Sequence, residues 1–322
     1  MVTVKPPDPR LLNQISVIIV SWNALSYLRG CLASIRETGG PWVREVIVVD
    51  NASTDGSPDM VAAEFPEVQL VRASRNLGFA QGNNLGIRHA SGSFLALVNS
   101  DVVVHPGCFE NLAKALESHP EVGLAGPRVT GRDGQLQRSC RRFPTVWNLA
   151  CRALALDRVL SGWSAFSGFE MRHWNYEDQR EVEVLSGCFW LARKTAVEKV
   201  GGLDERFFFY AEDVDWCKRL KAAGWKALFV PQATATHFGG GSSSNAPLRY
   251  SIEILKADLT YWGKHYGMVG RCAFRLLSIA HHGIRLVPRL FDGLKNSAAG
   301  QAHGRSMEHA VCLRWLLTGK GV

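Results

Sequence analysis

Short apolar runs rich in β-branched residues alternate with longer stretches of helical spacing through the first 130 residues of the chain. The apolar runs cover residues 15–22, 45–51, 68–74, 93–101 and 121–126. Three of the stretches between them, at 25–38, 79–90 and 106–118, are long enough for crossover helices. Nearly continuous apolar strands joined by helices are typical of a mostly parallel sheet with helices on both faces. We therefore predict an α/β fold of this kind.

Polar residues follow three of the predicted strands. They are Ser21 and Asn23 after the first run, Asp50, Asn51 and Ser53 after the second, and Asn99, Ser100 and Asp101 after the fourth. One such strand end is most simply a turn. Three at one edge of a parallel sheet predict a ligand site, because ligands bind at the carboxyl ends of these strands. The chain lacks both GxxxxGK[ST] and a GxGxxG after the first strand, which argues against P-loop nucleotidases and dinucleotide dehydrogenases.

The formal net charge of +8 lies mostly near the end of the chain. From residue 246 onward there are eleven Lys and Arg against four Asp and Glu, whereas the preceding residues have 26 against 25. A basic tail indicates an anionic partner, either a membrane surface or a nucleic acid. The eight cysteines form no CxxC pair or Cys/His cluster, so we expect reduced, mostly buried thiols. No uncharged apolar stretch of transmembrane length or signal-peptide pattern is present, so we expect a cytoplasmic protein.

Residues 269–289 have the clearest helical periodicity in the chain. One side of the predicted helix is basic and polar, with Arg271, Arg275, Ser278, His282, Arg285 and Arg289. The other side is apolar, with Val269, Ala273, Leu276, Ala280, Ile284 and Val287. Either the apolar side packs on the preceding domain, or the helix attaches through its basic side to the inner leaflet of a membrane. No nucleic-acid-binding motif accompanies the charge, so we expect no nucleic-acid partner.

Seven motifs follow one another between residues 14 and 245: SVIIVSWN, VVDNASTDGS, RNLGFAQGNNLGI, LVNSD, LSGCFWLAR, FFFYAEDVDW and HFGGGS. In this set and order the chain resembles the family 2 glycosyltransferases of the A-type nucleotide-sugar fold, especially their rhamnosyltransferase-like branch. The resemblance implies a Rossmann-like, mostly parallel central sheet flanked by helices, with a C-terminal amphipathic helical extension. It implies an N-terminal extension at 1–13, a nucleotide-sugar-binding half at 14–130, an acceptor-binding half at 131–245 and a basic helical tail at 246–322.

The resemblance also implies a metal site and a donor site. Asp101 stands where the family has its metal motif, and His237 resembles the family's later histidine, so the pair would hold Mn²⁺ or Mg²⁺. Many relatives have Asp where this chain has Asn99, which leaves open whether the ion is essential. Without the resemblance, the simplest interpretation of His237 is a structural role. Residues 75–83 would then only cap the helix predicted at 79–90. The implied donor-binding residues are Ser21, Asn23, Asp50, Asn51, Ser53, Arg75, Asn76, Gly78, Gly82, Asn83, Asn99 and Ser100.

Three carboxylates, Glu212, Asp213 and Asp215, follow four aromatic residues at 207–210. Acids at a helix start gain roughly 0.3–1 kcal/mol from the macrodipole, which is the simplest explanation for them. The resemblance instead assigns Asp213 as the general base, a role worth about 10²–10⁴ in rate. It implies Gly187, Tyr210 and Glu212 as acceptor-binding residues. Asp215, four residues before Arg219, is expected to form a surface ion pair.

One base and no candidate covalent partner imply a single displacement with inversion. The resemblance implies transfer from a nucleotide-diphosphate donor, foremost dTDP-L-rhamnose, to a saccharide or polyprenyl-diphosphate-linked saccharide in cell-surface polysaccharide synthesis. The enzyme would then work in the cytoplasm or on the cytoplasmic face of the membrane. Two alternatives stay open: a UDP-hexose donor, and a non-catalytic, membrane-associated scaffold that binds nucleotide sugars. The sequence sets neither the acceptor nor the oligomeric state.

Overall fold

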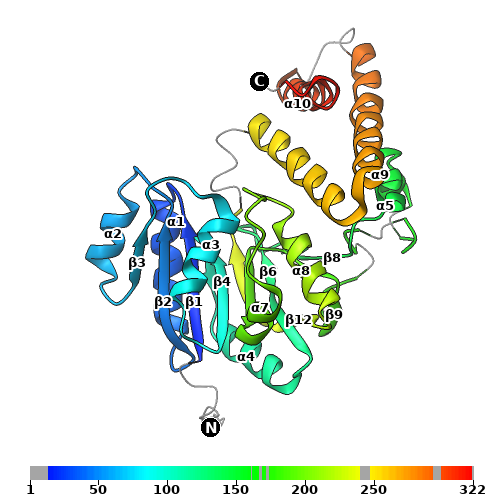
Figure 1. The fold of residues 1–322 in the computed structure, drawn as a ribbon. Coiled ribbons are helices and arrows are strands. Elements are labelled where there is room, and N and C mark those ends of the chain that lie inside the picture. Colours follow the sequence, from blue (N-terminus) through cyan, green and yellow to red (C-terminus); the bar gives the residue numbers. More distant parts are fainter. Residues whose placement is uncertain are drawn as a thin grey trace. The chain divides into compact units, whose positions relative to one another are not determined.

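Figure 1 shows the computed structural model, which describes residues 14–160, 162–166, 169–171, 174–239, 247–292 and 299–320. Side chains are described for these residues except 247, 287–292 and 299–306. The predicted extension at 1–13 therefore lies outside the described residues. The chain forms two compact units. The first consists of Met1–Arg141, Tyr176–Phe208 and Glu212–Ser242, and the second of Arg142–Asn175, Phe209–Ala211 and Ser243–Val322.

A ten-stranded sheet forms the centre of the first unit, and its main path runs β3-β2-β1-β4-β11-β6-β12-β5. Its strands are β1 (Ile15–Ser21), β2 (Val43–Asp50), β3 (Gln69–Arg72), β4 (Phe94–Asn99), β5 (Val102–Val104), β6 (Val122–Thr130), β7 (Leu136–Gln137), β9 (Arg180–Val182), β11 (Phe189–Arg193) and β12 (Lys226–His237). β8 (Cys140–Arg141) and β10 (Val184–Leu185) form a separate pair. β1 to β4 pair in parallel, and β11 runs antiparallel between β4 and β6. The predicted α/β class with a mostly parallel sheet is confirmed.

Helices cover both faces of this sheet (Figure 1). They are α1 (Leu25–Thr38), α2 (Ser57–Glu64), α3 (Gly78–His89), α4 (Cys108–Ser118), α7 (Lys194–Val200) and α8 (Glu212–Ala222). Alternate strand residues such as Val17 and Ile19 share the main apolar core with α1, α2 and α4. On the other face, α3 lies so close to β1 that a Cβ on Gly86 would be 2.4 Å from Ile18. Seven of the eight cysteines are buried and all are free, as predicted.

The second unit is helical. Its helices are α5 (Val146–Ala153), α6 (Leu156–Val159), α9 (Pro247–Asp292) and α10 (Ala299–Thr318). A capping box begins α5. Thr145 Oγ1 accepts from the backbone N–H of Asn148, and Asn148 Oδ1 accepts from the backbone N–H of Thr145. α9 breaks at Gly267, whose φ of 66° is outside the helical range and strains any residue with a Cβ. Tyr266, just before the break, donates its hydroxyl to the Pro144 carbonyl at 3.1 Å.

The amphipathic helix predicted at 269–289 is the second half of α9, and two arginines of its basic side contact other helices. Arg285 donates to the carbonyls of Arg152 and Ala153 in the last turn of α5. Arg275 donates its Nε proton to the carbonyl of Leu316 in the last turn of α10 at 2.8 Å. Carbonyls at helix ends lack intrahelical partners and carry partial negative charge, so they attract cationic side chains. The two arginines therefore serve as links between helices.

The apolar side of this half-helix is exposed as well, which the sequence did not predict. Val269 is 82% exposed and Leu276 is 66% exposed, and Ile284 is also exposed. Arg289 and Val287, which completed the two predicted sides, lie outside the residues whose side chains are described. Among the described residues, no helix combines the length and apolar character needed to cross a membrane.

Candidate active site

The parallel register places the polar strand ends together. Ser21 is the partner of Asp50 in the β1–β2 pairing, and Val20 is the partner of Asn99 in the β1–β4 pairing. The Asn51 amide continues this ladder by donating to the Ser21 carbonyl at 2.8 Å. The predicted alignment of the three strand ends at one edge is confirmed.

Hydrogen bonds to the backbone fix the loops at this edge. Both carboxylate oxygens of Asp50 accept from the backbone N–H of Ser53 at 3.3 Å, and Ser53 Oγ accepts from the backbone N–H of Asn23 at 3.0 Å. Asn23 Oδ1 in turn accepts from the Thr54 amide at 2.8 Å. Ser21 Oγ is buried and has no hydrogen-bond partner within the described residues. Such a hydroxyl is costly to leave unpaired, so its position fits a ligand that supplies the missing hydrogen bond.

Several amides assigned to the donor site have structural partners. Gly78 has a φ of 77°, and a Cβ there would be 2.4 Å from the Phe208 carbonyl oxygen, so this contact requires glycine. Asn51 donates to the Gly78 carbonyl at 3.0 Å, and Asn76 accepts from the Gly78 amide at 2.9 Å. Asn83 is buried and donates to a carbonyl of its own helix at 3.0 Å. These residues shape the loop before α3.

The remaining predicted donor residues differ in exposure. A Cβ on Gly82 would be 2.8 Å from Val20, so this glycine allows α3 to approach β1. Arg75 is exposed and Ser100 is half-buried. Their side chains can therefore be reached by a ligand, unlike the glycine and the buried amides.

Asp101 and His237 meet where β12 pairs with β5. Asp101 Oδ1 lies 3.3 Å from His237 Nε2, and Asn99 Nδ2 lies 3.5 Å from the same nitrogen. His237 Nδ1 lies 2.9 Å from Gln137 Oε1, so a proton on Nδ1 leaves Nε2 as an acceptor. Histidines that bind metals are oriented by such a partner on the other nitrogen, so the pair fits a divalent ion. In the described part of the chain no third His, Cys, Asp or Glu joins this pair at ligand spacing.

Asp213 forms a buried ion pair in the first turn of α8. Its Oδ2 accepts from Arg141 Nη2 at 2.5 Å, and its Oδ1 accepts from the Val214 amide at 2.8 Å. The side chain of Asp213 is 9% exposed and that of Arg141 is 26% exposed. The charge of Asp213 is the main reason that the pKa of Arg141 is raised. The Asp213 carboxylate is thus held in place by a guanidinium and by a backbone amide at the start of α8.

Glu212, next to Asp213 in the chain, is a buried carboxyl group with a raised pKa. Burial raises the pKa of Glu212 to about 8, and the charge of Asp213 adds to that rise. Its Oε2 is buried and has no hydrogen-bond partner within the described residues. A protonated carboxyl can donate as well as accept a hydrogen bond. The buried Oε2 of Glu212 therefore has room for a hydrogen bond to a ligand.

We predict that Glu212→Gln reduces the pH dependence of stability. The folded chain keeps a proton on Glu212 up to a pKa of about 8, whereas the ordinary value of 4.5 applies when the chain is unfolded. Between these values the unfolded state binds fewer protons, so stability falls as pH rises, by up to about 1.4 kcal/mol per pH unit. Urea unfolding of both proteins between roughly pH 5 and pH 8 measures this slope. Parallel stability curves for parent and variant would contradict a buried, protonated Glu212.

Asp215 pairs with Arg219 at 2.8 Å, as predicted, but the expected surface location is wrong. Asp215 is fully buried. Arg219 also donates to the carbonyls of Val200 and Gly202. Arg219 therefore links α8 to the end of α7 and the residues after it. It also supplies the charge partner that a buried carboxylate requires.

The predicted acceptor residues are divided between the units. Tyr210 belongs to the second unit, where its ring packs edge-on against Phe209 and Tyr250. Tyr210 and Ala211 have φ values of 72° and 61°, a conformation that is strained for residues other than glycine. In the first unit, a Cβ on Gly187 would lie 3.3 Å from the Trp190 ring.

Sequence reasoning did not assign two residues that contact the site, Arg141 and Gln137. Arg141 is 72 positions from Asp213, and Gln137 is 100 positions from His237. The signal for Arg141 in the sequence is the arginine-rich stretch RSCRR at 138–142. Nothing in that stretch shows which arginine meets the carboxylate.

Comparison with known proteins identifies a family and several relatives. The model of the family described as Glycosyl transferase family 2 matches residues 16–201. The N-acetylglucosaminyl-diphospho-decaprenol L-rhamnosyltransferase of Mycobacterium tuberculosis is 30% identical over 249 residues, which cover 74% of this chain and 80% of the relative. The pre-mycofactocin glycosyltransferase of the same organism is 26% identical over 72% of this chain and 44% of its own length.

Solved structures confirm the expected A-type glycosyltransferase fold. The mannosyltransferase PcManGT from Pyrobaculum calidifontis, in complex with GDP-Man and Mn²⁺, matches with a TM-score of 0.58 and 18% identity over 98% of this chain and 90% of its own. GalNAc-T7 with UDP, GalNAc and Mn²⁺ matches with a TM-score of 0.57 and 14% identity over 96% of this chain and 56% of its own. The family match and the fold together show that this chain belongs to glycosyl transferase family 2 and is a glycosyltransferase.

Proposed function

We propose that the protein is an inverting rhamnosyltransferase that uses dTDP-L-rhamnose and a lipid-linked saccharide acceptor in cell-surface polysaccharide synthesis. The observation that carries inverting transfer is the ion-paired Asp213 beside Glu212, whose buried Oε2 lacks a partner within the described residues. Support for the donor and acceptor comes from the mycobacterial relative, whose name specifies an L-rhamnosyl donor group and a diphospho-decaprenol acceptor.

In the proposed reaction Asp213 acts as the base. The acceptor hydroxyl oxygen forms a bond to the anomeric carbon of the sugar, and its proton passes to Asp213. The bond from that carbon to the nucleotide diphosphate breaks, and the electron pair leaves with the diphosphate oxygen. Because attack and departure occur on opposite sides, the anomeric configuration inverts. Arg141 holds the carboxylate in position, and Glu212 and Gly187 of the first unit would bind the acceptor.

The donor would occupy the strand-end edge of the first unit. We assign donor binding to residues 14–130 and acceptor binding mainly to 131–245. Ser21 Oγ is available for a donor hydrogen bond, and Asp50 would contact the base or ribose. Arg75 can reach a phosphate because it is exposed.

Asp101 and His237 would hold a divalent ion, Mn²⁺ or Mg²⁺. When bound, such an ion supplies positive charge to the leaving diphosphate. The observation in favour is that His237 Nδ1 is engaged by Gln137 while Nε2 faces Asp101. Because Asn99 contributes no charge, substrate phosphate oxygens would complete the coordination. Two solved structures of the same fold contain Mn²⁺.

A transfer assay tests this function. The purified protein is incubated with Mn²⁺ or Mg²⁺, membrane lipid extract, and either dTDP-L-rhamnose or one of several UDP-hexoses, beside Asp101→Asn. We expect labelled lipid from dTDP-L-rhamnose alone, with turnover reduced in the variant because one metal ligand is lost. Turnover of a UDP-hexose would favour the same-fold alternative. Donor binding without any turnover would favour the non-catalytic scaffold.

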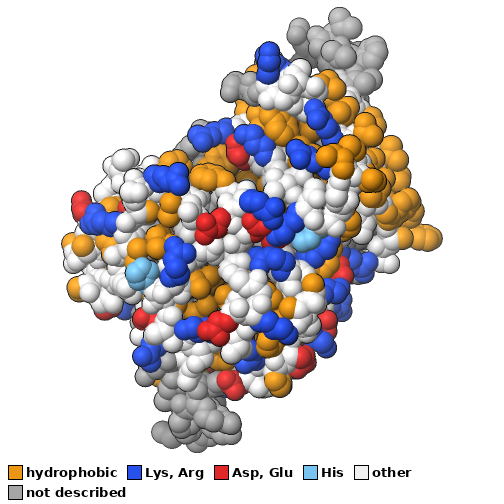
Figure 2. Space-filling model, in the orientation of Figure 1, with side chains coloured by type: hydrophobic (Ala, Val, Ile, Leu, Met, Phe, Trp, Pro, Cys, Tyr) orange, Lys and Arg blue, Asp and Glu red, His pale blue; other side chains and the backbone are white. Residues whose placement is uncertain are grey.

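We also propose that the second unit binds the cytoplasmic face of the membrane. Apart from Tyr27 and Phe208, every exposed large hydrophobic side chain among the described residues belongs to this unit. Figure 2 shows hydrophobic side chains gathered over α5 and α9. The exposed large hydrophobic residues at 146–163, a range that contains α5 and α6, are Val146, Trp147, Leu154, Val159 and Trp163. Exposed apolar surface on this scale indicates an interaction site, and tryptophan favours the membrane–water interface.

The charge of the second unit favours an anionic lipid surface. Its residues contain 15 Lys and Arg against 6 Asp and Glu, whereas the first unit has 22 against 23. Arg152, Arg158 and Arg271 are exposed beside the apolar side chains. Each basic residue near anionic lipid contributes about 1 kcal/mol, and the apolar groups add burial in the headgroup region.

We predict that the protein sediments with vesicles of phosphatidylglycerol and phosphatidylcholine but much less with pure phosphatidylcholine. Replacing Trp147 and Trp163 together by Ser should weaken binding by about tenfold or more, because two interfacial anchors are lost. Tyr27→Ser, an exposed aromatic of the first unit, is the matched control and should bind as the parent does. Equal binding of the tryptophan variant, or lipid-independent self-association of the parent, would contradict this surface.

A further inference from the structure

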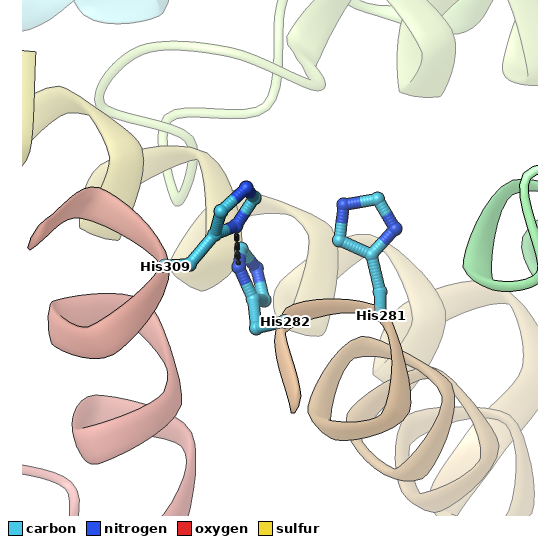
Figure 3. A group of neighbouring side chains, drawn as sticks. All are labelled: His281, His282 and His309. Carbon is cyan, nitrogen blue, oxygen red and sulfur yellow. Dashed lines mark hydrogen bonds between the residues drawn. The ribbon is translucent and has the colours of Figure 1, made fainter. Parts of the chain in front are cut away.

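Three histidines of the second unit gather between α9 and α10, and none has a role in the proposed transfer. His281 and His282 come from α9 and His309 from α10 (Figure 3). One ring nitrogen from each lies within 4.8 Å of the others. His282 Nδ1 and His309 Nδ1 are 2.9 Å apart. Among the described residues, these three histidines form the group of three or more His, Cys, Asp or Glu side chains that lie close enough together to hold one metal ion.

The surroundings keep these rings ready to act as ligands. All three are half-buried. A neutral imidazole carries a lone pair on one ring nitrogen, which is the atom that binds a metal ion. His281 also forms a hydrogen bond with the backbone of Arg152. A bond from one ring nitrogen to a carbonyl is how proteins orient a histidine whose other nitrogen binds metal.

The donor set selects the type of ion. Three imidazole nitrogens with no carboxylate in the group suit Zn²⁺, Ni²⁺ or Cu²⁺, whereas Mg²⁺ and Ca²⁺ require oxygen ligands. Imidazole nitrogen forms strong coordinate bonds to these transition-metal ions, so the site does not depend on a negative charge nearby.

We propose that His281, His282 and His309 form a binding site for a zinc-type transition-metal ion that joins α9 to α10. The ion replaces the His282–His309 hydrogen bond by coordinate bonds, and water completes the coordination. The two helices are otherwise linked by Ser251 to Glu308 at 2.7 Å and by Arg275 to the Leu316 carbonyl. Metal bound to the folded state alone stabilises it by mass action, so the site would strengthen this helical unit.

Zinc titration of the full chain without an affinity tag tests the site. We expect one ion per chain at this site and a higher melting temperature in its presence. His282→Gln and His309→Gln should each weaken zinc binding by at least about 100-fold. Loss of a residue that only supports a ligand already costs up to about 100-fold, and each variant loses a ligand itself. His89→Gln, an exposed histidine of α3, is the matched control. His237→Gln is a second control, which distinguishes this site from the Asp101–His237 pair. Both His89→Gln and His237→Gln should still bind zinc at the three-histidine site.

X-ray absorption at the zinc edge of the parent protein gives a second measurement that does not depend on folding of the variants. Three imidazole nitrogens at about 2.0–2.1 Å support the site. A zinc ion with one or no imidazole ligand would overturn it. So would parent-like zinc affinity in His309→Gln, or no zinc binding by the parent at micromolar concentration.

Discussion

Asp213→Asn lowers the rate of sugar transfer by about 10²–10⁴ while the nucleotide sugar still binds, if this carboxylate is the base. The amide has nearly the same shape, and it can still accept a hydrogen bond from Arg141 Nη2, now 2.5 Å from Asp213 Oδ2. It cannot take the proton from the acceptor hydroxyl. Initial rates with labelled donor, together with donor affinity by calorimetry, separate chemistry from binding.

The matched control is Asp59→Asn, which changes an exposed acid in the first turn of α2. Its activity should equal that of the parent, because a helix-start acid affects stability by only roughly 0.3–1 kcal/mol. If Asp213→Asn transferred sugar as fast as Asp59→Asn, Asp213 would be a helix-start acid and another base would be needed. Loss of donor binding in Asp213→Asn would also count against the assignment.

Arg141→Gln is expected to destabilise the folded protein by about 3 kcal/mol, the lower end for removal of one partner from a buried ion pair. The reason is that Asp213, with a side chain 9% exposed, would lose its guanidinium partner. The lower end applies because Arg141 is 26% exposed and water can enter in its place. Urea unfolding near neutral pH measures the change in free energy.

Two comparisons make this result specific. Arg29→Gln breaks an exposed pair with Glu64, in which both side chains are 45% exposed, and should cost only about 0–1 kcal/mol. The double variant Arg141→Gln with Asp213→Asn should recover much of the stability lost in Arg141→Gln, because no unpaired charge remains. Equal losses in the two arginine variants, or no recovery in the double variant, would contradict a strong buried pair.

Local pattern was enough to predict the framework of the first unit. The segment at 25–38 is α1 to the residue, and the runs at 15–22 and 45–51 became β1 and β2. Apolar periodicity reports which residues are buried in a sheet or helix, and it acts over a few neighbouring positions. The strand ends followed from the same argument, since parallel register forces Ser21 and Asp50 to one edge. The seven ordered motifs supplied the family.

The sequence by itself therefore determined the α/β class, the edge that carries polar residues, and the acidic start of α8. Only the tertiary structure decided that Arg141 meets Asp213, that Gln137 orients His237, and which side of α9 is exposed. These contacts join residues far apart in the chain, and side-chain spacing carries no information about a partner on another element. An amphipathic pattern separates two sides of a helix, but it does not show that Arg275 and Arg285 bond helix-end carbonyls or that the apolar side of α9 stays exposed.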